Sequence, residues 1–335
     1  MLRFLTIRLL LILLALLGLT ALVFAIARLL PGDPVALAAG PNATPAEIAE
    51  YGRQFGLDKP LWTQYWTYLT GLLHGDFGVS LFTHRPVRED LIAYLPATLE
   101  LVLAAMALAM LIGIPAGLWA AVRVNAWPDY LTRVLALGSI SMPRFFLGLV
   151  LQLLFAMWLG WLPLGGRFPI TEDPPALITG FLTIDALLAG NGHAFWVALQ
   201  HLAMPALAMS LSPLATLLRM MRASTLEVLQ QDYVLTERAL GLPQRLILLK
   251  YVTRNAISST LTVTGLYFGW LLGGTVLVET IFDWPGLGLY ATQSVITQDF
   301  MAVIGVTLVI GVLFVAANLV IDLLYGVVNP RVRLE

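Results

Sequence analysis

The side chains best suited to polar chemistry are concentrated in one stretch of the chain, residues 227–255. Long apolar runs lie on both sides of it, so we expect it to lie outside a bilayer that its neighbours cross. Its charged residues are Glu227, Asp232, Glu237, Arg238, Arg245, Lys250 and Arg254. Charged side chains held on short helices form ion pairs and hydrogen bonds with another protein. The stretch therefore predicts a docking surface; the alternative is a solvated connector.

Two residues divide this stretch into helices. Gly241 suits the left-handed conformation that ends many helices. Pro243, with its fixed φ and its missing N–H, suits the first turn of the next helix. We therefore expect one short helix that ends at Gly241 and a second that starts at Pro243. Such a helix–glycine–helix knob is rigid, whereas simple connectors between elements are usually shorter.

Catalytic and metal chemistry find little support in the sequence. The chain has no cysteine, which excludes disulfides, thiolate metal sites and cysteine nucleophiles. The four histidines, at positions 74, 84, 193 and 201, show no metal-ligand spacing. The sequence contains no Gly-x-x-x-x-Gly-Lys-[Ser/Thr] phosphate loop, so we expect the chain not to hydrolyse ATP itself. We predict no catalytic residue, no metal site and no cofactor in this chain.

Composition sets the fold class. Of 335 residues, 59% are hydrophobic and only 12% are charged, against about 25% charged in soluble domains. So many apolar residues cannot all be buried in one soluble core, which predicts an all-α polytopic membrane protein with the lipid bilayer as a partner. The formal net charge of -1 gives no reason to expect nucleic acid binding.

Six transmembrane helices are expected, over residues 9–27, 101–122, 134–162, 195–218, 256–278 and 301–325. A cleaved signal peptide is the alternative for the first, but the run is longer than a usual signal sequence. Between the first two spans, the block Thr44-Pro-Ala-Glu47 predicts a helix to about residue 55, and a second helix should start near Pro60. The second helix carries a stripe of Trp62, Tyr65, Trp66, Leu69 and Leu73. Such a stripe suits the membrane surface or packing on a neighbouring span, and both explanations stay open.

Arg144 is the most informative single charge. It follows Pro143, which interrupts the third predicted span. An arginine inside a bilayer costs about 2.5–3.5 kcal/mol, so such residues usually face an aqueous path or a partner. Arg144 is therefore a candidate for the transport pathway, with a structural ion pair at the membrane edge as the alternative.

The distribution of Lys and Arg orients the chain. With both termini inside, twelve of the nineteen Lys and Arg residues fall on the inner side. The positive-inside rule then places the 227–255 stretch in the cytoplasm, within a loop over 222–256. Three parts follow: residues 1–30 as tail and first transmembrane helix, 31–97 as an extracytoplasmic helical segment, and 98–335 as a core with five transmembrane helices.

Six blocks, in order, carry a family resemblance. They are Leu30-Pro-Gly-Asp-Pro34, Gly56-Leu-Asp-Lys-Pro60 with Gly75-Asp-Phe-Gly78, Ser141-Met-Pro143 with Phe145, the loop over 232–255, Val278-Glu-Thr-Ile-Phe-x-Trp-Pro-Gly-Leu-Gly288, and Asn318-Leu-x-x-Asp322-Leu-Leu-Tyr-Gly-x-x-Asn-Pro-Arg331. Along nearly its whole length the chain resembles the permease subunits of bacterial ABC importers for peptides and nickel. The likeness is greatest to the B-type transmembrane subunit of dipeptide importers.

The resemblance implies a type I ABC importer permease fold and a set of partners. A second, homologous permease subunit would complete the pore as a heterodimer, and two ATPase subunits would bind ATP and Mg at the cytoplasmic face. An extracytoplasmic binding protein would deliver dipeptides or short oligopeptides for alternating access across the bacterial inner membrane. Nickel or another small solute is the alternative cargo. A secondary transporter, which needs several ionisable groups inside its spans, is less well supported.

The resemblance also implies functional residues. Those expected to couple to the ATPases are Asp232, Tyr233, Glu237, Arg238, Ala239, Gly241, Arg245 and Arg254. Those expected to dock the binding protein or form an outer gate are Asp76, Glu279, Asp283 and Trp284. The family signature Glu-Ala-Ala-x-x-x-Gly is altered here, because Leu235, Thr236 and Glu237 occupy its first three positions, and Ser259 stands where relatives often have proline.

Overall fold

The computed structural model describes residues 2–29, 44, 46, 53, 59–80 and 82–328. Every regular element in these residues is a helix, and one isolated antiparallel bridge joins Val79 to Pro86. The all-α prediction is thereby confirmed. The block that ends at Pro34 and the block from Asn329 onward lie outside the described residues, as does the helix predicted over 44–55 apart from residues 44, 46 and 53. The chain forms two compact units: a larger one of residues 96–289 and 313–335, and a smaller one of residues 2–95 and 290–312.

The smaller unit contains α1 (Leu2–Leu29), α4 (Leu61–Leu73), the start of α5 (Val87–Val122), the end of α14 (Leu287–Ile296) and the start of α15 (Phe300–Val328). α4 packs on α1: the Tyr65 hydroxyl lies 3.0 Å from Thr20 Oγ1, and the Tyr65 ring lies edge-on to Phe24 with centroids 5.3 Å apart. Trp62 and Trp66 stack on each other and remain exposed. Packing on a span therefore accounts for part of the aromatic stripe and leaves the tryptophans facing outward.

Two buried carboxylates hold the loop between α4 and α5. Asp299, just before α15, accepts a hydrogen bond from Ser80 Oγ at 2.5 Å. Asp90, in the first turn of α5, accepts from Thr83 Oγ1 at 2.5 Å and from the Tyr290 hydroxyl at 3.0 Å. Hydrogen bonds to ionised groups are stronger than neutral ones, so these contacts fix the loop firmly.

α5 begins at Val87, well before residue 101, where the predicted second span starts. Glu89 and Asp90 occupy its first turn, where negative charge is favourable to the helix macrodipole. A search for uncharged runs misses such a start, because the first turns of a helix that leaves a membrane are polar. Pro96 and Pro115 lie inside the helix without ending it.

The larger unit is built around one long helix. Its elements are α6 (Trp127–Ser141), α7 (Arg144–Leu151), η1 (Gln152–Trp158), α8 (Leu182–Leu188), α9 (Gly192–Leu229), α10 (Asp232–Ala239), α11 (Gln244–Leu246), η2 (Ile247–Val252), α12 (Thr253–Gly273) and α13 (Val276–Ile281), with the remainder of α5, α14 and α15. α9 packs against α6, α7, α8, α12 and α13. It extends past both ends of the predicted fourth span, 195–218.

α5 approaches α9 closely through two glycines one helical turn apart. A Cβ on Gly117 would lie 2.5 Å from the Leu218 carbonyl oxygen, and a Cβ on Gly113 would lie 3.0 Å from the Leu214 carbonyl oxygen. This is the small-xxx-small pattern by which membrane helices bring their backbones together. The two glycines therefore set the distance between α5 and α9.

The predicted third span is broken where Pro143 interrupts it. α6 ends at Ser141, Met142 is extended with φ −98° and ψ 125°, and α7 begins at Arg144. The residue before a proline disfavours the helical conformation, which explains the break. The helical run resumes and, through the π-helix η1, ends at Trp158 rather than near residue 162.

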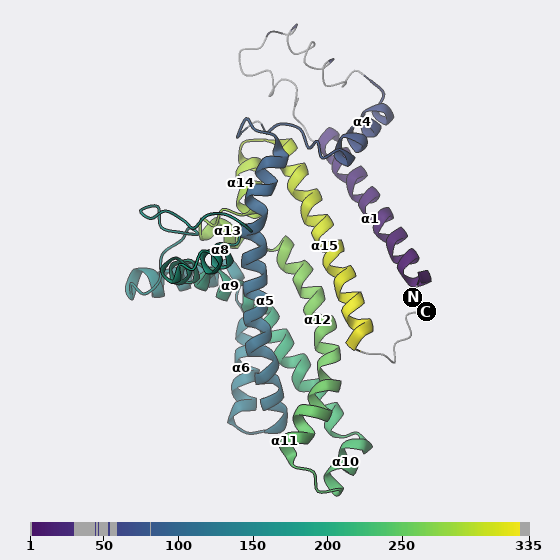
Figure 1. The fold of residues 1–335 in the computed structure, drawn as a ribbon, viewed down its shortest axis with the longest axis vertical. Coiled ribbons are helices and arrows are strands. Elements are labelled where there is room, and N and C mark those ends of the chain that lie inside the picture. Colours follow the sequence, from purple (N-terminus) through teal and green to yellow (C-terminus); the bar gives the residue numbers. More distant parts are fainter. Residues whose placement is uncertain are drawn as a thin grey trace. The chain divides into compact units, whose positions relative to one another are not determined.

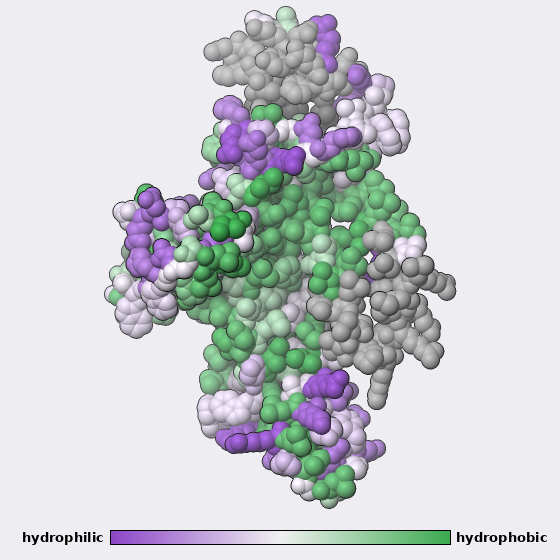
Figure 2. Space-filling model, viewed as in Figure 1, coloured by the Kyte–Doolittle hydropathy of each residue, from purple (hydrophilic) through white to green (hydrophobic). Residues whose placement is uncertain are grey.

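Four described helices are long and apolar enough to cross a membrane: Thr6–Ile26 within α1, Val87–Val122, Gly192–Leu229 and Phe300–Val320 within α15. Figure 2 shows hydrophobic side chains covering the long helices and hydrophilic ones gathered over α10 and α11. α12 is less apolar, and it ends at Gly273 rather than at 278. The count of six spans stays a prediction.

Candidate functional site

The predicted knob consists of α10, held between the ends of two long helical runs (Figure 1). Asp232 lies in the first turn of α10, and Arg238 lies in its last turn. Negative charge near the start and positive charge near the end both complement the helix macrodipole. These charges help to stabilise a helix of 8 residues, a length that is marginal in isolation.

Gly241 ends α10 in the predicted left-handed conformation, with φ +76°. Its N–H donates to the Arg238 carbonyl at 3.0 Å, and the Leu242 N–H donates to the Glu237 carbonyl at 3.3 Å. This pair of hydrogen bonds is a Schellman motif, which satisfies carbonyls at the end of a helix. A Cβ at position 241 would meet no atom within 4 Å. The backbone conformation, and not the available space, therefore requires glycine here.

A small apolar core stabilises the knob. Val234 of α10 is buried against Ile247 and Val252 of η2. The partly buried residues packed around them are Val228, Leu229, Leu242 and Leu248. The core joins the end of α9, the turn after α10 and the start of the next helical run. Through this core the knob packs against the end of α9 and against the helical run that leads into α12.

The second short helix predicted from Pro243 is not a separate element. α11 forms one turn, Gln244–Leu246, and continues through η2 into α12, while Pro243 precedes it in an extended conformation. No glycine or proline interrupts residues 244–264, so nothing ends the helix at the membrane boundary. The prediction of an independent helix was wrong, and the knob connects to α12 without a break.

All eight predicted coupling residues lie on this loop. Glu237 is half-buried, and the exposed ones are Asp232, Tyr233, Arg238, Ala239, Gly241, Arg245 and Arg254. Within the described part of the chain, none of their charged side chains forms an ion pair. The Tyr233 hydroxyl accepts a hydrogen bond from Asn255 Nδ2 at 3.0 Å. The charges are thus available to another protein, and their coupling role stays a prediction.

Sequence reasoning missed four leucines on the same surface. Leu235, Leu240, Leu246 and Leu249 expose 51%, 72%, 40% and 70% of their side chains. The sequence did contain a signal for this surface, because the loop is too polar to enter a bilayer and yet carries these apolar side chains. Interfaces combine apolar anchors with a polar rim, so these leucines belong with the charged residues as candidate contacts.

At the other end of the larger unit, Glu279 is a fully buried carboxylate in α13. It accepts hydrogen bonds from Thr98 Oγ1 at 2.7 Å, from the Gly288 N–H at 2.6 Å and from the Leu289 N–H at 3.0 Å. A Cβ on Gly286 would lie 2.5 Å from Glu279 Oε2. The glycines of the 278–288 block therefore leave room for this carboxylate, which ties the block to α5.

The four predicted outer residues have different surroundings. Glu279 and Trp284 are buried, and Trp284 Nε1 donates to the Ala97 carbonyl at 2.9 Å. Asp283 is exposed with φ +47°, and Asp76 in the smaller unit is exposed and accepts from the Gly78 N–H at 2.9 Å. Two of the four therefore hold the backbone in place, and two present carboxylates to solvent. A docking or gating role stays a prediction for all four.

A second buried carboxylate, Glu100, was not singled out from the sequence. It forms an ion pair with Arg167, which also donates to the Gly180 carbonyl at 2.5 Å. Glu100 accepts as well from Thr183 Oγ1 at 2.6 Å. The Arg167 guanidinium lies 5.8 Å from the Trp284 ring centroid. This network fastens the 165–192 insert to α5 and to the Glu279 block. Its only sequence signal was an isolated acid near the predicted start of a span.

Arg144 opens α7 and lines a cavity of about 310 Å³ with Ser139 of α6 and Ser212 of α9. Its guanidinium approaches Gly274, where a Cβ would lie 2.7 Å from Nη1. No described carboxylate lies within ion-pair distance of it. The alternative of a structural ion pair therefore finds no partner in the described residues.

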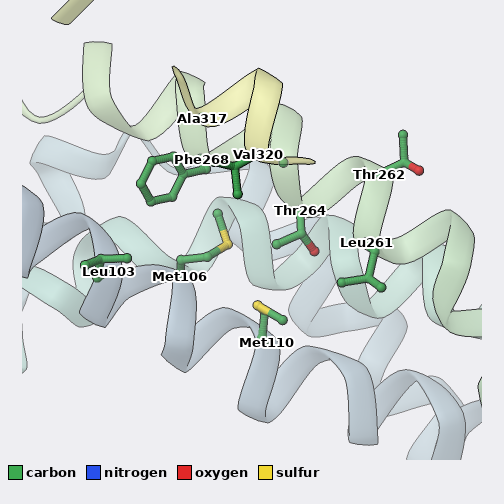
Figure 3. A pocket seen from close by; sticks show the side chains of 10 residues that line it. Leu103, Met106, Met110, Leu261, Thr262, Thr264, Phe268, Ala317 and Val320 are labelled. Atoms are coloured by element: carbon green, nitrogen blue, oxygen red, sulfur yellow. The ribbon is translucent and has the colours of Figure 1, made fainter. Parts of the chain in front are cut away.

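Another cavity, of about 380 Å³, lies between α5, α12 and α15 (Figure 3). Leu103, Met106 and Met110 line it from α5, and Leu261, Thr264 and Phe268 line it from α12. Methionine side chains adapt to ligands of different shape. The cavity is almost entirely apolar, and no residue of it was predicted from the sequence, because leucine, methionine and phenylalanine there read as ordinary membrane-helix residues.

Two family models match the chain. The model described as the inner membrane component of binding-protein-dependent transport systems matches residues 113–334, and the model for the N-terminal part of such components matches residues 1–102. Together they span nearly the whole sequence. The boundary between them falls within α5, one of the helices that the two compact units share.

Curated relatives agree with these matches. The chain is 46% identical over 94% of its length, and 93% of the relative, to a probable D,D-dipeptide transport system permease protein of Escherichia coli. It is 41% identical over 97% of its length, and 98% of the relative, to a dipeptide transport system permease protein of Alkalihalophilus pseudofirmus. It is 39% identical over 93% of its length, and 92% of the relative, to a glutathione transport system permease protein of Salmonella typhimurium. The chain therefore belongs to the family of inner membrane components of binding-protein-dependent transport systems.

Proposed function

We propose that this chain is the transmembrane subunit of an ATP-driven importer that moves dipeptides or short oligopeptides across the cytoplasmic membrane by alternating access. Relatives named for dipeptides match nearly the whole chain at 40–46% identity. The relative named for glutathione is 39% identical. Glutathione is itself a tripeptide, so the substrates in these names share the chemistry of short peptides.

One observation carries the proposal: the Schellman-capped knob, with charges that no described residue pairs and four exposed leucines. A surface of this kind fits a protein partner, because apolar anchors and unpaired charges both gain from a complementary surface. ATP and Mg would be bound by that partner, a pair of ATPase subunits. Closure of the ATPases would push the knob, and the small core around Val234 would pass the movement to α9 and α12.

A second, similar permease subunit would complete the pore as a heterodimer, and an extracytoplasmic binding protein would deliver the peptide. The exposed carboxylates of Asp76 and Asp283 offer contacts for that protein. We further propose six crossings with both termini cytoplasmic, the broken run α6–η1 and α12 supplying the two crossings beyond the four long helices. Arg144, a cation beside a cavity, is the candidate contact for substrate in the pathway.

The test is uptake of labelled dipeptides in cells that lack the chromosomal copy and carry a plasmid copy. We expect deletion to abolish dipeptide uptake and the plasmid copy to restore it. Unlabelled dipeptides and glutathione serve as competitors, and nickel uptake is measured in parallel. Intact dipeptide uptake together with lost nickel uptake in the deletion strain would favour nickel as the cargo and overturn the peptide assignment.

A further inference from the structure

A basic cavity of about 350 Å³ lies between α6 and α9, and it shares no lining residue with the cavity beside Arg144 or with the predicted coupling residues. The residues that line it are Thr132, Arg133 and Ala136 from α6, with Leu218, Arg219 and Arg222 from α9. Three arginines thus line a hollow together with the apolar side chains of Ala136 and Leu218. Neither the proposed transport pathway nor the proposed ATPase contact uses this place.

Within the described residues, one carboxylate pairs with two of these three guanidinium groups. Buried Asp129 accepts hydrogen bonds from Arg222 Nε at 2.6 Å and from Arg133 Nη2 at 2.7 Å. Within the described residues, Arg219 has no ion-pair partner. Three positive charges less one negative charge leave an excess of two positive charges at the cavity. An anion that enters it meets preformed positive charge, because Asp129 already holds two of the guanidinium groups in position.

Aromatic side chains beside the cavity indicate its depth in the membrane. Trp119 and Trp127 pack edge to face with ring centroids 5.1 Å apart, and both are exposed. Tyr130 is exposed as well, and the Arg133 guanidinium lies 5.8 Å from its ring centroid. Tryptophan and tyrosine gather where the hydrocarbon core meets the headgroups. This combination of aromatic side chains and arginines is typical of the level of the lipid phosphates.

The surface of α6 next to the cavity is apolar. Leu131, Val134 and Leu135 of α6 expose 47%, 66% and 52% of their side chains. Val134 and Leu135 follow Arg133 along α6, and both also line the neighbouring cavity beside Arg144. A lipid with its phosphate among the arginines can lay its acyl chains along this face.

We propose that this cavity binds an anionic phospholipid of the cytoplasmic leaflet, with its phosphodiester between Arg133, Arg219 and Arg222 and its acyl chains on α6. The proposal rests on the cytoplasmic orientation of the 222–256 loop proposed above. Basic pockets between transmembrane helices on the cytoplasmic side suit anionic headgroups. A zwitterionic lipid offers no net negative charge to the two excess positive charges. The site would therefore select phosphatidylglycerol over phosphatidylcholine.

The experiment titrates the purified complete complex with phosphatidylglycerol or phosphatidylcholine and measures lipid binding by native mass spectrometry. The test variant is Arg219→Gln, since Arg219 is exposed and forms no ion pair within the described residues. We expect about fivefold weaker binding of phosphatidylglycerol, because one cation near the surface contributes about 1 kcal/mol. Arg219→Lys should keep most of the affinity. Arg123→Gln removes an exposed arginine outside the cavity and should change nothing.

Three outcomes would overturn the lipid assignment. The first is equal affinity of the wild type and Arg219→Gln for phosphatidylglycerol, or equal affinity for the two lipids. The second is displacement of the lipid by soluble glycerol phosphate at equal concentration, which would indicate a site for free anions. The third is loss of the second permease subunit in Arg219→Gln with lipid binding unchanged, which would indicate a subunit contact. Lipid selectivity without dipeptide uptake would overturn the proposed substrate and leave the lipid site standing.

Discussion

Gly241 is the single residue at which backbone conformation bears most directly on coupling. Its φ of +76° allows two hydrogen bonds that end α10 and turn the chain toward α11. Because no atom lies near a Cβ at this position, a substitution there acts through backbone strain. A substitution at this position therefore changes the backbone conformation of the knob without disturbing its side-chain packing.

Gly241→Val should leave membrane insertion intact and uncouple transport from ATP hydrolysis. A β-branched residue at positive φ costs of order 1–3 kcal/mol, which is enough to reorient a short helix but small beside the insertion of several spans. The measurement is ATPase stimulation by substrate and binding protein in reconstituted vesicles. Gly241→Asn is the matched control, because asparagine tolerates the left-handed conformation and should keep coupling. Normal stimulation in the valine variant would contradict the coupling role.

Residue-level predictions held where the cause was local. The left-handed glycine and the break before Arg144 follow from the conformations that glycine and proline impose on their own neighbours. The burial of Glu279 and Trp284 did not follow from the sequence, since their partners, Thr98 and the carbonyl of Ala97, lie far away in the chain. A polar, turn-rich block looks exposed until the helix that covers it is known.

The contact between α5 and α9 depends on glycines rather than on large apolar side chains. Gly117→Ala should lower the melting temperature of the purified complex, because the added methyl would lie 2.5 Å from the Leu218 carbonyl oxygen and force the two helices apart. Gly138→Ala in α6 is the control: nothing lies within 4 Å of a Cβ there, and alanine stabilises a helix by about 1 kcal/mol relative to glycine. Equal melting temperatures for the two variants would show that the close approach is not required.

Asp129 joins α6 to α9 by an ion pair whose strength should depend on pH. The hydrogen bond from Arg222 holds the pKa of Asp129 well below its usual range. A lowered pKa means that the stabilisation is fully present above the ordinary value of about 3.9 and is lost as pH falls below it. Wild type and Asp129→Asn should therefore differ by a constant margin in melting temperature from pH 7 to about 5. That margin should shrink below about pH 4, and a margin that shrinks already between pH 7 and 6 would contradict this account.

Helices were easier to predict than their ends. Uncharged runs located parts of all the long helices, because a bilayer demands apolar side chains over a fixed length. The runs could not give the start of α5 at Val87 or the continuity of α11 with α12, since a helix that leaves the membrane keeps its hydrogen bonds while its side chains become polar. The length of an uncharged run reflects the thickness of the hydrocarbon core, whereas the helix itself extends beyond it.

For the whole molecule, orientation is the prediction on which the others depend. A single cysteine at position 240 lies on the knob, and the chain has no cysteine of its own to interfere. In intact cells it should react with membrane-permeant maleimides and stay unmodified by impermeant ones, because the knob is expected in the cytoplasm. A cysteine at exposed Asp76 is the matched control and should react with both reagents. Labelling of position 240 by the impermeant reagent would overturn the orientation.

The overall family could be predicted from ordered blocks, and a charged knob between two long helical runs could be predicted from its polar residues. The ion pairs that stabilise the interior of the protein could not be predicted. Glu100 with Arg167, and Asp129 with Arg222, join positions separated by dozens of residues, and nothing in one sequence says which acid meets which arginine. The arrangement of such pairs is where the structure adds most.

One continuous helical run, from Gln244 of α11 to Gly273 of α12, leads from the knob to the block that carries Glu279. At 1.5 Å per residue it spans about 45 Å. If this run links the two ends energetically, the linkage must be reciprocal: whatever factor ATPase docking imposes on affinity for the binding protein, the binding protein imposes on affinity for the ATPase. Leu266 is exposed on α12, so Leu266→Pro interrupts the run with little loss of packing, and Leu266→Ala is its control. Both affinity factors are measured by titrating the ATPase and the binding protein against the permease in nanodiscs. In the proline variant both factors should fall together toward one. A fall in only one of them would mean that the signal travels by another route.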